Sequence, residues 1–350
     1  MPADPAAPRG AVSAAVLSWL DGFVDELAVP ESQRLLLASV VRGGWHQLTE
    51  LPELPAAALP VLVHAAAGGE DGVALPLGGA CTLVFLGADL LDDLADGELS
   101  ESWSHVSPAQ TTLVAATMLS ALPILALARL DAPAETSAQL ASLFGGGLLA
   151  MSAGQHLDLL GAGARETSPR EALAVVEDKS GAEFALFARC GAVLAGIDAQ
   201  RSNAFADMGH AVGVAAQVLS DMGDLAGPLP SQDLLNGTRT TPVVHGLTAR
   251  SSDRRGRLLE LLDLAQRSSD VHEEVRRALS RSGSFAYAAL VVGCWRQRAL
   301  RRLEQAEPHG PGGHALRAFV DELTSLAPLA GPPPAEPVAA AEAAASSAGP

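Results

Sequence analysis

Four aspartates interrupt an otherwise apolar run between Phe85 and Glu98, at positions 89, 92, 93 and 96. This spacing of i, i+3, i+4 and i+7 places all four carboxylates on one face if the segment is an α-helix. Like charges at that spacing repel one another, and burying them without counter-charge is very costly. A divalent cation such as Mg²⁺ removes both costs, because it coordinates carboxylate oxygens. Taken alone, the stretch fits an exposed acidic turn at a helix end equally well.

The composition predicts an all-α protein. Ala, Leu and Gly dominate the 350 residues, aromatic residues make up only 4%, and no alternating strand pattern persists. A chain of this length can bury a substantial core. Because no repeat or interdomain linker is visible, we expect one helical domain over residues 10–330. Residues 1–9 and the Pro/Ala-rich tail at 331–350 are expected to be disordered.

Capping residues and Gly/Pro breaks divide the chain into predicted helices. The second of them is expected to end at a Gly43-Gly44 C-cap. Ser168, Pro169 and Glu171 form a capping box that opens one long helical segment. The predicted helices span residues 11–27, 31–41, 54–67, 75–97, 107–128, 135–160, 168–196, 203–225, 252–267, 269–281, 284–306 and 313–326.

The net charge of -17 disfavours nucleic acid or an anionic membrane as a partner, and it suits a protein that recruits metal cations. The stretch from Val106 to Ala128 carries no charge and is long enough to span a bilayer. It also contains several Ser, Thr and Pro residues and lacks a flanking Lys/Arg cluster or an aromatic belt. We therefore predict a buried helix of a bundle and no membrane span.

The three cysteines at positions 81, 190 and 294 are far apart and odd in number. A disulfide framework or a zinc site is therefore not expected, and a reducing cytoplasm is the predicted location. The segment from Met1 to Pro5 shows no basic region followed by an apolar core, so no secretory signal is predicted there.

A second acidic patch follows about 125 residues after the first. Asp221 and Asp224 are spaced i, i+3 near the end of a long predicted helix, beside Ser220 and one turn after Gln217. Two carboxylate-bearing helices that face each other across a bundle would build a polynuclear Mg²⁺ site able to hold a diphosphate from both sides. Basic side chains could add positive charge to the same group, and the candidates are Lys179 and Arg239.

Five segments in this order resemble motifs of the trans-polyprenyl synthase family, which has the class I isoprenoid synthase fold. Residues 92–96 resemble its first aspartate-rich motif, DDxxD, and residues 154–159 resemble GQxxDL. Lys179-Ser180 stands where the family has a Lys-Thr pair. Residues 217–224 resemble the second aspartate-rich motif, with Ser220 in place of its first aspartate, and residues 233–242 resemble DLxxGKxTLP.

This resemblance implies a single-domain helical bundle with a central active-site cavity, three Mg²⁺ ions, a prenyl diphosphate substrate and a homodimer. It also assigns roles to residues. The catalytic aspartates would be Asp92, Asp93 and Asp96; the metal ligands Asp92, Asp96, Ser220, Asp221 and Asp224; and the diphosphate-binding residues Lys179, Gln217 and Arg239.

The departures from the family pattern matter as much as the matches. Chain-elongating members bind a second diphosphate through GGKRxR and an Arg pair that follows the first aspartates. Here Trp45, His46 and Leu48 occupy the three basic positions, and no arginine follows Asp96 until Arg129. A diphosphate without cationic partners binds poorly, so the site for the second substrate looks dismantled while the metal site looks retained.

An enzyme that ionises an allylic diphosphate without an acceptor leaves the carbocation to react with its own double bonds. The resemblance therefore points to the class IB terpene synthases, which cyclise geranylgeranyl or farnesyl diphosphate and release diphosphate. Two alternatives stay open: a short-chain trans-prenyltransferase, and a non-catalytic subunit that has kept the fold.

Residues expected to line the substrate pocket are apolar, aromatic or small, and core packing is the alternative role for each aromatic. Small residues one turn before Asp92 would leave depth for a long substrate, and Asp158 would join a hydrogen-bond network below the site. The predicted pocket residues are Trp45, Phe85, Gly87, Ala88, Gln155, Asp158 and Phe184. Asp233 is expected to organise its loop. Asp89 is expected to be either an extra metal-shell carboxylate or a protonated group.

Overall fold

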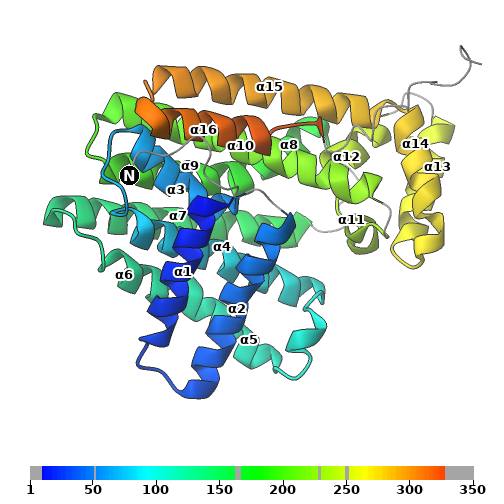
Figure 1. The fold of residues 1–350 in the computed structure, drawn as a ribbon. Coiled ribbons are helices and arrows are strands. Elements are labelled where there is room, and N and C mark those ends of the chain that lie inside the picture. The colour runs from blue at the N-terminus through cyan, green and yellow to red at the C-terminus, as the bar shows by residue number, and fades with distance from the viewer. Residues whose placement is uncertain (1–9, 51–52, 162–166, 228–229, 249–251, 328–350) are drawn as a thin grey trace, which may run out of the picture.

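Helices are the only regular elements in the part of the chain that the computed structural model describes, which is residues 10–50, 53–161, 167–227, 230–248 and 252–327 (Figure 1). The all-α prediction is therefore confirmed. The first half of the chain forms α1 (Ala11–Asp25), α2 (Glu31–Glu50), α3 (Pro55–Ala66), α4 (Leu75–Asp96), the 3-10 helix η1 (Glu101–Trp103), α5 (Pro108–Leu119), α6 (Ala121–Leu127) and α7 (Ala134–Gly161). The second half forms α8 (Pro169–Val176), the π-helical turn η2 (Glu177–Gly181), α9 (Ala182–Leu194), α10 (Ala199–Ala226), α11 (Gln232–Asn236), α12 (Thr241–Leu247), α13 (Ser252–Ala265), the 3-10 helix η3 (Ser269–Val271), α14 (His272–Arg281), α15 (Ser284–Gln305) and α16 (Gly310–Leu323).

Helix α10 organises the main core. It packs along α9 and α15, while α3 packs against α9, α16 and α4. Phe205, Met208 and Val212 of α10 have no exposed surface, so the helix is buried along most of its length. A smaller apolar cluster joins the end of α10 to α12, α13 and α14, which stand together at one end of the molecule in Figure 1.

Two glycines let α10 lie unusually close to its neighbours. A Cβ at Gly213 would collide with the carbonyl oxygen of Ser180, and one at Gly209 would collide with that of Phe184. Any larger residue would push α10 away from η2 and α9. The absence of these two side chains therefore brings the end of α10 next to the turn at Lys179 and Ser180.

The structure corrects the predicted helices at several points. Helix α2 continues through Gly43-Gly44 to Glu50, because Gly44 serves close packing instead of a C-cap: a Cβ there would lie 3.1 Å from Leu17 Cδ2. The segment that opens at Ser168 is interrupted by η2, and π-helical turns of this kind often occur at functional sites. The short helices α11 and α12 were not predicted.

The uncharged stretch from Val106 to Ala128 forms two helices, which break at Ser120, whose hydroxyl donates to the Ala116 carbonyl. It is less buried than expected, since Leu113 is 59% exposed and Ile124 66%. By length and composition alone, two segments among the described residues resemble membrane spans, Leu75–Ala95 and Pro108–Leu127. The first is 67% buried inside the protein, as a core helix would be.

The expected disorder at 1–9 and 331–350 concerns residues outside the described ranges. The single domain at 10–330 stays a prediction.

The glycine contacts predict a difference between two substitutions on the same helix. Gly213→Ala should lower the free energy of unfolding by about 1–3 kcal/mol, because the added methyl group overpacks the contact with Ser180. Gly223→Ala is the matched control, since no atom lies within 4 Å of its added Cβ. It should leave stability unchanged or raise it by up to about 1 kcal/mol. Urea denaturation measures both; equal stability of the two variants would contradict the close approach.

Candidate active site

The first acidic group consists of Asp89 and Asp92 on α4 together with Glu183 on α9. Gly97, with a φ of 75°, ends α4 directly after the aspartate run. Lys179 of η2 reaches across and places its Nζ 2.9 Å from Asp92 Oδ2. Asp89 accepts a hydrogen bond from the side chain of Gln47 on α2. Three elements besides α4 thus contribute to this group.

Burial dominates the electrostatics of the first acidic group. It raises the pKa of Asp89 to about 7, with further increases from Asp93 and Asp92. It raises the pKa of Glu183 to about 8, with Asp89 adding to the increase and Lys179 opposing it. Both residues keep some surface access although protein surrounds their carboxyl groups. This combination is typical of side chains that line an internal hollow.

The second acidic group consists of Asp221, Asp224 and Asp233. Burial raises the pKa of Asp221 to about 6, against hydrogen bonds from the Gln217 side chain and the Thr241 backbone N–H. Burial also raises the pKa of Asp233 to about 7, with repulsion from Asp221 and Asp224 adding to it. This end of α10 therefore concentrates carboxylates that lack enough positive charge.

Asp224 has a structural task in this group. Its Oδ1 accepts the backbone N–H of Gln232 at 3.0 Å, and its Oδ2 accepts the backbone N–H of Asp233 at 3.2 Å and the hydroxyl of Ser231. The carboxylate therefore holds the start of α11 against the end of α10. Its remaining lone pairs are still available to a further partner.

The turn η2 connects the two acidic groups, and we call it the bridging turn (Glu177–Gly181). Its Lys179 pairs with Asp92, as described above. The next residue, Ser180, donates from Oγ to Gln217 Oε1 at 2.9 Å, and Gln217 Nε2 donates to Asp221 Oδ1 at 2.9 Å. Two consecutive residues thus contact the first and the second aspartate motif, which are about 125 positions apart in the sequence.

A second connection joins α4 to α11. Glu98, just after α4, accepts hydrogen bonds at Oε1 from Gln232 Nε2 at 2.7 Å and from the Asn236 side chain. Its charge also contributes to the raised pKa of Asp233. These contacts hold the end of α4 against α11.

The structure brings together several of the predicted metal and diphosphate residues, namely Asp92, Lys179, Gln217 and Asp221. Ser220 and Asp93 are exposed on the surfaces of their helices. Arg239 is half-buried, with its Nε and Nη1 atoms buried. The side chains of Asp96 and Asp158 lie outside the described part of the structure, so their predicted roles stay predictions.

The predicted pocket lining is only partly supported. The space beside Gly87 is filled by α5, since a Cβ there would lie 2.9 Å from Met118 Cβ, so this glycine adds no depth below the metal site. Trp45 donates from Nε1 to Asp21 Oδ2 at 3.0 Å and so faces α1. Phe184 is buried with its Cβ against Gly213. These three residues serve helix packing.

The remaining pocket candidates are half-buried: Phe85, Ala88 and Gln155. Of these, Phe85 and Ala88 lie within one turn of Asp89 on α4. They stay candidates for the lining of the site.

Sequence reasoning missed four residues of the site: Gln47, Glu98, Glu183 and Asp233, the last of which was expected only to organise its loop. Glu183 lies four residues after Lys179 in a helix whose only other charged residue is Arg189, and that sparse charge was the available signal. Gln47 and Glu98 belong to the site only because α2 and α11 fold back on α4, which no local pattern shows.

The donor set fits a hard divalent cation. Oxygen donors predominate, and burial raises the pKa of Asp89 and Asp221 because the carboxylates lack counter-charge, which a bound cation would supply. Among the described side chains, no three or more His, Cys, Asp or Glu residues already form a metal-binding group. Cation binding would therefore use ligands besides these side chains, such as water and diphosphate oxygens, and an ion count is not fixed by their arrangement.

Comparisons with known proteins agree with this arrangement. The family model described as Polyprenyl synthetase matches residues 78–280, which include both acidic groups and the bridging turn. A nonaprenyl diphosphate synthase of Mycobacterium tuberculosis is 28% identical over 181 residues, which are 49% of this chain and 52% of that protein. The chain thus matches about half the length of this curated relative.

Solved structures share the fold. A geranylgeranyl pyrophosphate synthetase from Pyrococcus horikoshii Ot3 is similar with a TM-score of 0.74 at 20% identity, covering 89% of this chain and 95% of that one. A decaprenyl diphosphate synthase from Rhodobacter capsulatus is similar with a TM-score of 0.76 at 17% identity and the same coverage. At these sequence identities, the similarity shows that the chain has the isoprenoid synthase fold, and it does not identify a substrate or a reaction.

The raised pKa values predict how stability depends on pH without metal. The folded chain holds protons on Asp89 and Glu183 that the unfolded chain has already lost, so stability is lost as pH rises toward 7 and 8. Each group contributes a slope of up to about 1.4 kcal/mol per pH unit within its window. Thermal unfolding in EDTA should therefore occur at lower temperature at pH 8.5 than at pH 5.5.

The double variant Asp89→Asn, Glu183→Gln should reduce this pH dependence, because it removes two groups with raised pKa values from the linkage, while Asp221 and Asp233 remain. Asp207→Asn is the control, since Asp207 forms an exposed pair with Arg302 and should leave the slope intact. An unchanged slope in the double variant would contradict the assignment.

Proposed function

Because the chain belongs to the polyprenyl synthetase family, we propose that it ionises a linear allylic prenyl diphosphate, breaking the bond between the allylic carbon and the diphosphate oxygen. The electron pair leaves with the diphosphate, and an allylic carbocation remains. Charge thus develops on the leaving group, where an enzyme stabilises it with positive groups fixed in advance.

The bridging turn is the observation that carries this proposal. It holds Lys179 against Asp92 and connects Ser180 through Gln217 to Asp221. A diphosphate between the two acidic groups would contact the Lys179 ammonium. Lys179 would then exchange the carboxylate oxygen of Asp92 for an oxygen of the diphosphate. Arg239 is the second basic candidate on this side.

Mg²⁺ is the cation that this donor set suits; when bound, it neutralises the charge that develops on the leaving diphosphate. Asp92, Asp221 and Asp224 are the described residues that would hold it, and Asp96 is the further candidate from the sequence. Gln217 orients Asp221 by its hydrogen bond. The three-ion site stays part of the proposal.

The names of the relatives favour prenyl transfer as the fate of the cation. They are a nonaprenyl diphosphate synthase, a geranylgeranyl pyrophosphate synthetase and a decaprenyl diphosphate synthase, and each name denotes the synthesis of a prenyl diphosphate. The comparisons thus favour a prenyl diphosphate synthase, the alternative in the sequence analysis, over the predicted cyclase, and with nonaprenyl and decaprenyl synthases among the relatives they give no preference for a short chain. Transfer is therefore the first candidate.

Cyclisation is the second candidate, because one observation favours it. On α2, the side chains of Trp45 and Leu48 are uncharged and offer no positive charge to a second diphosphate; Trp45 is bound to Asp21, and Leu48 packs against the core. Between Gly97 and Ser107, all of which is described, the chain has no Lys or Arg. An acceptor diphosphate would have few cationic partners there.

Helix α5 fills the space beside Gly87, so this glycine gives no information on the length of the substrate. Geranyl, farnesyl and geranylgeranyl diphosphates are therefore all proposed substrates. The homodimer and the cytoplasmic location expected from the sequence are retained as proposals.

Removing one carboxylate from either acidic group should abolish ionisation. Asp92→Asn and Asp221→Asn should each lower diphosphate release from an allylic substrate with Mg²⁺ by about 100-fold or more. Asp207→Asn, on the same helix as Asp221 but paired with Arg302 on the surface, should leave it within about twofold. Unchanged release in Asp92→Asn or Asp221→Asn would contradict the proposed site.

Prenyl transfer and cyclisation are distinguished by the products that they form. The protein is incubated with Mg²⁺ and each allylic diphosphate, with and without isopentenyl diphosphate, and the extract and aqueous phase are analysed by mass spectrometry. A longer linear diphosphate that forms only with isopentenyl diphosphate establishes transfer and excludes cyclisation. A cyclic hydrocarbon or alcohol that forms equally without it establishes cyclisation and excludes transfer.

A further inference from the structure

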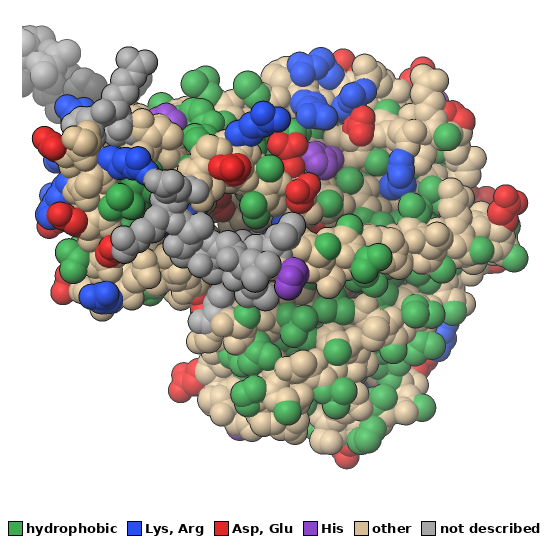
Figure 2. Space-filling model, turned by 180° about the vertical axis from the view of Figure 1, so that it is seen from behind, with side chains coloured by type: hydrophobic (Ala, Val, Ile, Leu, Met, Phe, Trp, Pro, Cys, Tyr) green, Lys and Arg blue, Asp and Glu red, His purple; other side chains and the backbone are tan. Residues whose placement is uncertain are grey.

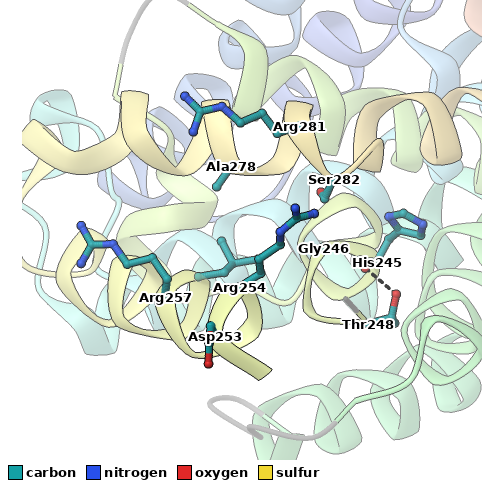
Figure 3. A pocket seen from close by; sticks show the side chains of 10 residues that line it. His245, Gly246, Thr248, Asp253, Arg254, Arg257, Ala278, Arg281 and Ser282 are labelled. Carbon is teal, nitrogen blue, oxygen red and sulfur yellow. Dashed lines mark hydrogen bonds between the residues drawn. The ribbon is translucent and has the colours of Figure 1, made fainter. Parts of the chain in front are cut away.

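A pocket of about 890 Å³ lies between α12, α13 and α14, away from both acidic groups (Figure 3). Its lining combines three arginines with His245, two small polar residues and an apolar floor. The lining residues used below are His245, Arg254, Arg257, Leu258, Arg281 and Ser282. None of them belongs to the two acidic groups or to the bridging turn.

The surroundings of the pocket are positive in a strongly acidic protein. Between Ser252 and Arg281 the chain has seven arginines against six carboxylates, whereas the whole chain has a net charge of -17. Seen from behind (Figure 2), Lys and Arg side chains are concentrated in the upper half of the molecule and at the end that carries α13 and α14. The lower half of that face is mainly hydrophobic or uncharged.

The three arginines are available to a ligand to different degrees. Within the described chain, Arg254 and Arg281 enter no ion pair, and Arg257 pairs with Glu260 at 3.2 Å and Glu274 at 3.5 Å. Those partners are more than half exposed, so the pairs are weak and an anion can replace them. Figure 3 shows Arg254 extending toward Ser282 and His245, with Arg257 and Arg281 at the opposite end.

The inner end of the pocket is shaped for a hydrogen-bonded and partly apolar group. His245 stacks on Tyr287 with ring centroids 4.3 Å apart, and its Nδ1 lies 3.2 Å from Ser284 Oγ. Leu258 is buried beneath, and a Cβ at Gly246 would meet Leu279 Cδ2 at 2.7 Å, so α12 lies close to its neighbours. The Asp253 carboxylate at the rim opposes anions, while the N-terminus of α13 favours them.

We propose that this pocket binds a small molecule that carries a diphosphate group. Guanidinium groups bind phosphoryl oxygens in a bidentate manner, and three of them around one pocket offer more donors than a single phosphate uses. The volume exceeds that of the diphosphate alone, so an organic body fits over the floor at Leu258. The chemistry of the pocket does not depend on the reaction proposed above.

Helix α12 links this pocket to the second acidic group. Its first residue, Thr241, donates its backbone N–H to Asp221, and its last turn carries His245 and Gly246 into the pocket lining. On the other side, Arg276 of α14 donates from Nε to the Leu225 carbonyl at 2.6 Å, at the end of α10. A ligand that bridges α12, α13 and α14 would therefore restrain the Thr241 contact.

Calorimetric titration in EDTA tests the proposal with no divalent cation at the two acidic groups. The probes are inorganic diphosphate, geranyl diphosphate and ADP. We expect the double variant Arg254→Ala, Arg281→Ala to weaken binding by about tenfold or more, because it removes two charged donors. The control, Arg301→Ala with Arg317→Ala, removes the same charge from exposed positions of α15 and α16 and should stay within about twofold.

The order of the affinities for the three probes identifies the kind of ligand that carries the diphosphate group. Tighter binding of geranyl diphosphate indicates a prenyl ligand, tighter binding of ADP a nucleotide, and equal binding the free anion. Each of these supports the pocket. No binding by the natural chain at millimolar probe, equal binding by the double variant, or an equal loss in the control would overturn it.

Hydrogen exchange gives a readout that requires neither turnover nor Mg²⁺. Adding the tightest probe in EDTA should slow amide exchange at least about twofold in peptides that cover residues 240–247, and not in peptides from α1. Unchanged exchange in the α12 peptides while the probe is bound would overturn the placement of the ligand in this pocket.

Discussion

The contacts of two consecutive residues, Lys179 and Ser180, unite the site. The Lys179–Asp92 pair is 41% and 32% exposed at its two side chains, so it adds little to stability. Its value is positional: it fixes a cation beside the first aspartate motif while Ser180 and Gln217 fix the orientation of Asp221. A π-helical turn makes this arrangement possible, because it changes the register between α8 and α9 within a few residues.

That turn depends on packing elsewhere. Gly213 and Gly209 remove the side chains that would separate α10 from Ser180 and Phe184, so the second motif can reach the turn. Buried carboxylates then accumulate on both sides, and their raised pKa values show that the fold leaves them short of positive charge. The same shortage that costs stability without metal provides the driving force for binding a cation.

Much of the fold could be predicted from the sequence, because capping boxes and Gly/Pro breaks are local signals. Ser107 and Ser168 start their helices as expected, and α4 carries the aspartates to its end at Gly97. Gly43-Gly44 misled the prediction, since a glycine pair that ends one helix can serve close packing in another. The break at η2 has no local signal, because π-turns are stabilised by tertiary contacts.

The site was predictable where carboxylates recur at helical spacing in apolar sequence, as at Asp92 and Asp221, and Lys179 was predictable from its place in the family motifs. Glu183 and Gln47 became part of it only through the folding of α9 and α2 onto α4. Gly87 was the opposite case. The sequence analysis took a small residue near the site as evidence of empty space, but the neighbouring helix α5 fills that space.

The most direct test of a single shared site is a double-mutant cycle on the Mg²⁺-dependent part of diphosphate affinity, measured by calorimetry for Asp92→Asn, Asp221→Asn and the double variant. Because both acidic groups would hold one ligand, each single variant should lose most of this affinity, and the double variant should lose far less than the sum of the two free-energy changes. Additive losses, or a single variant that binds as well as the natural chain, would contradict the account.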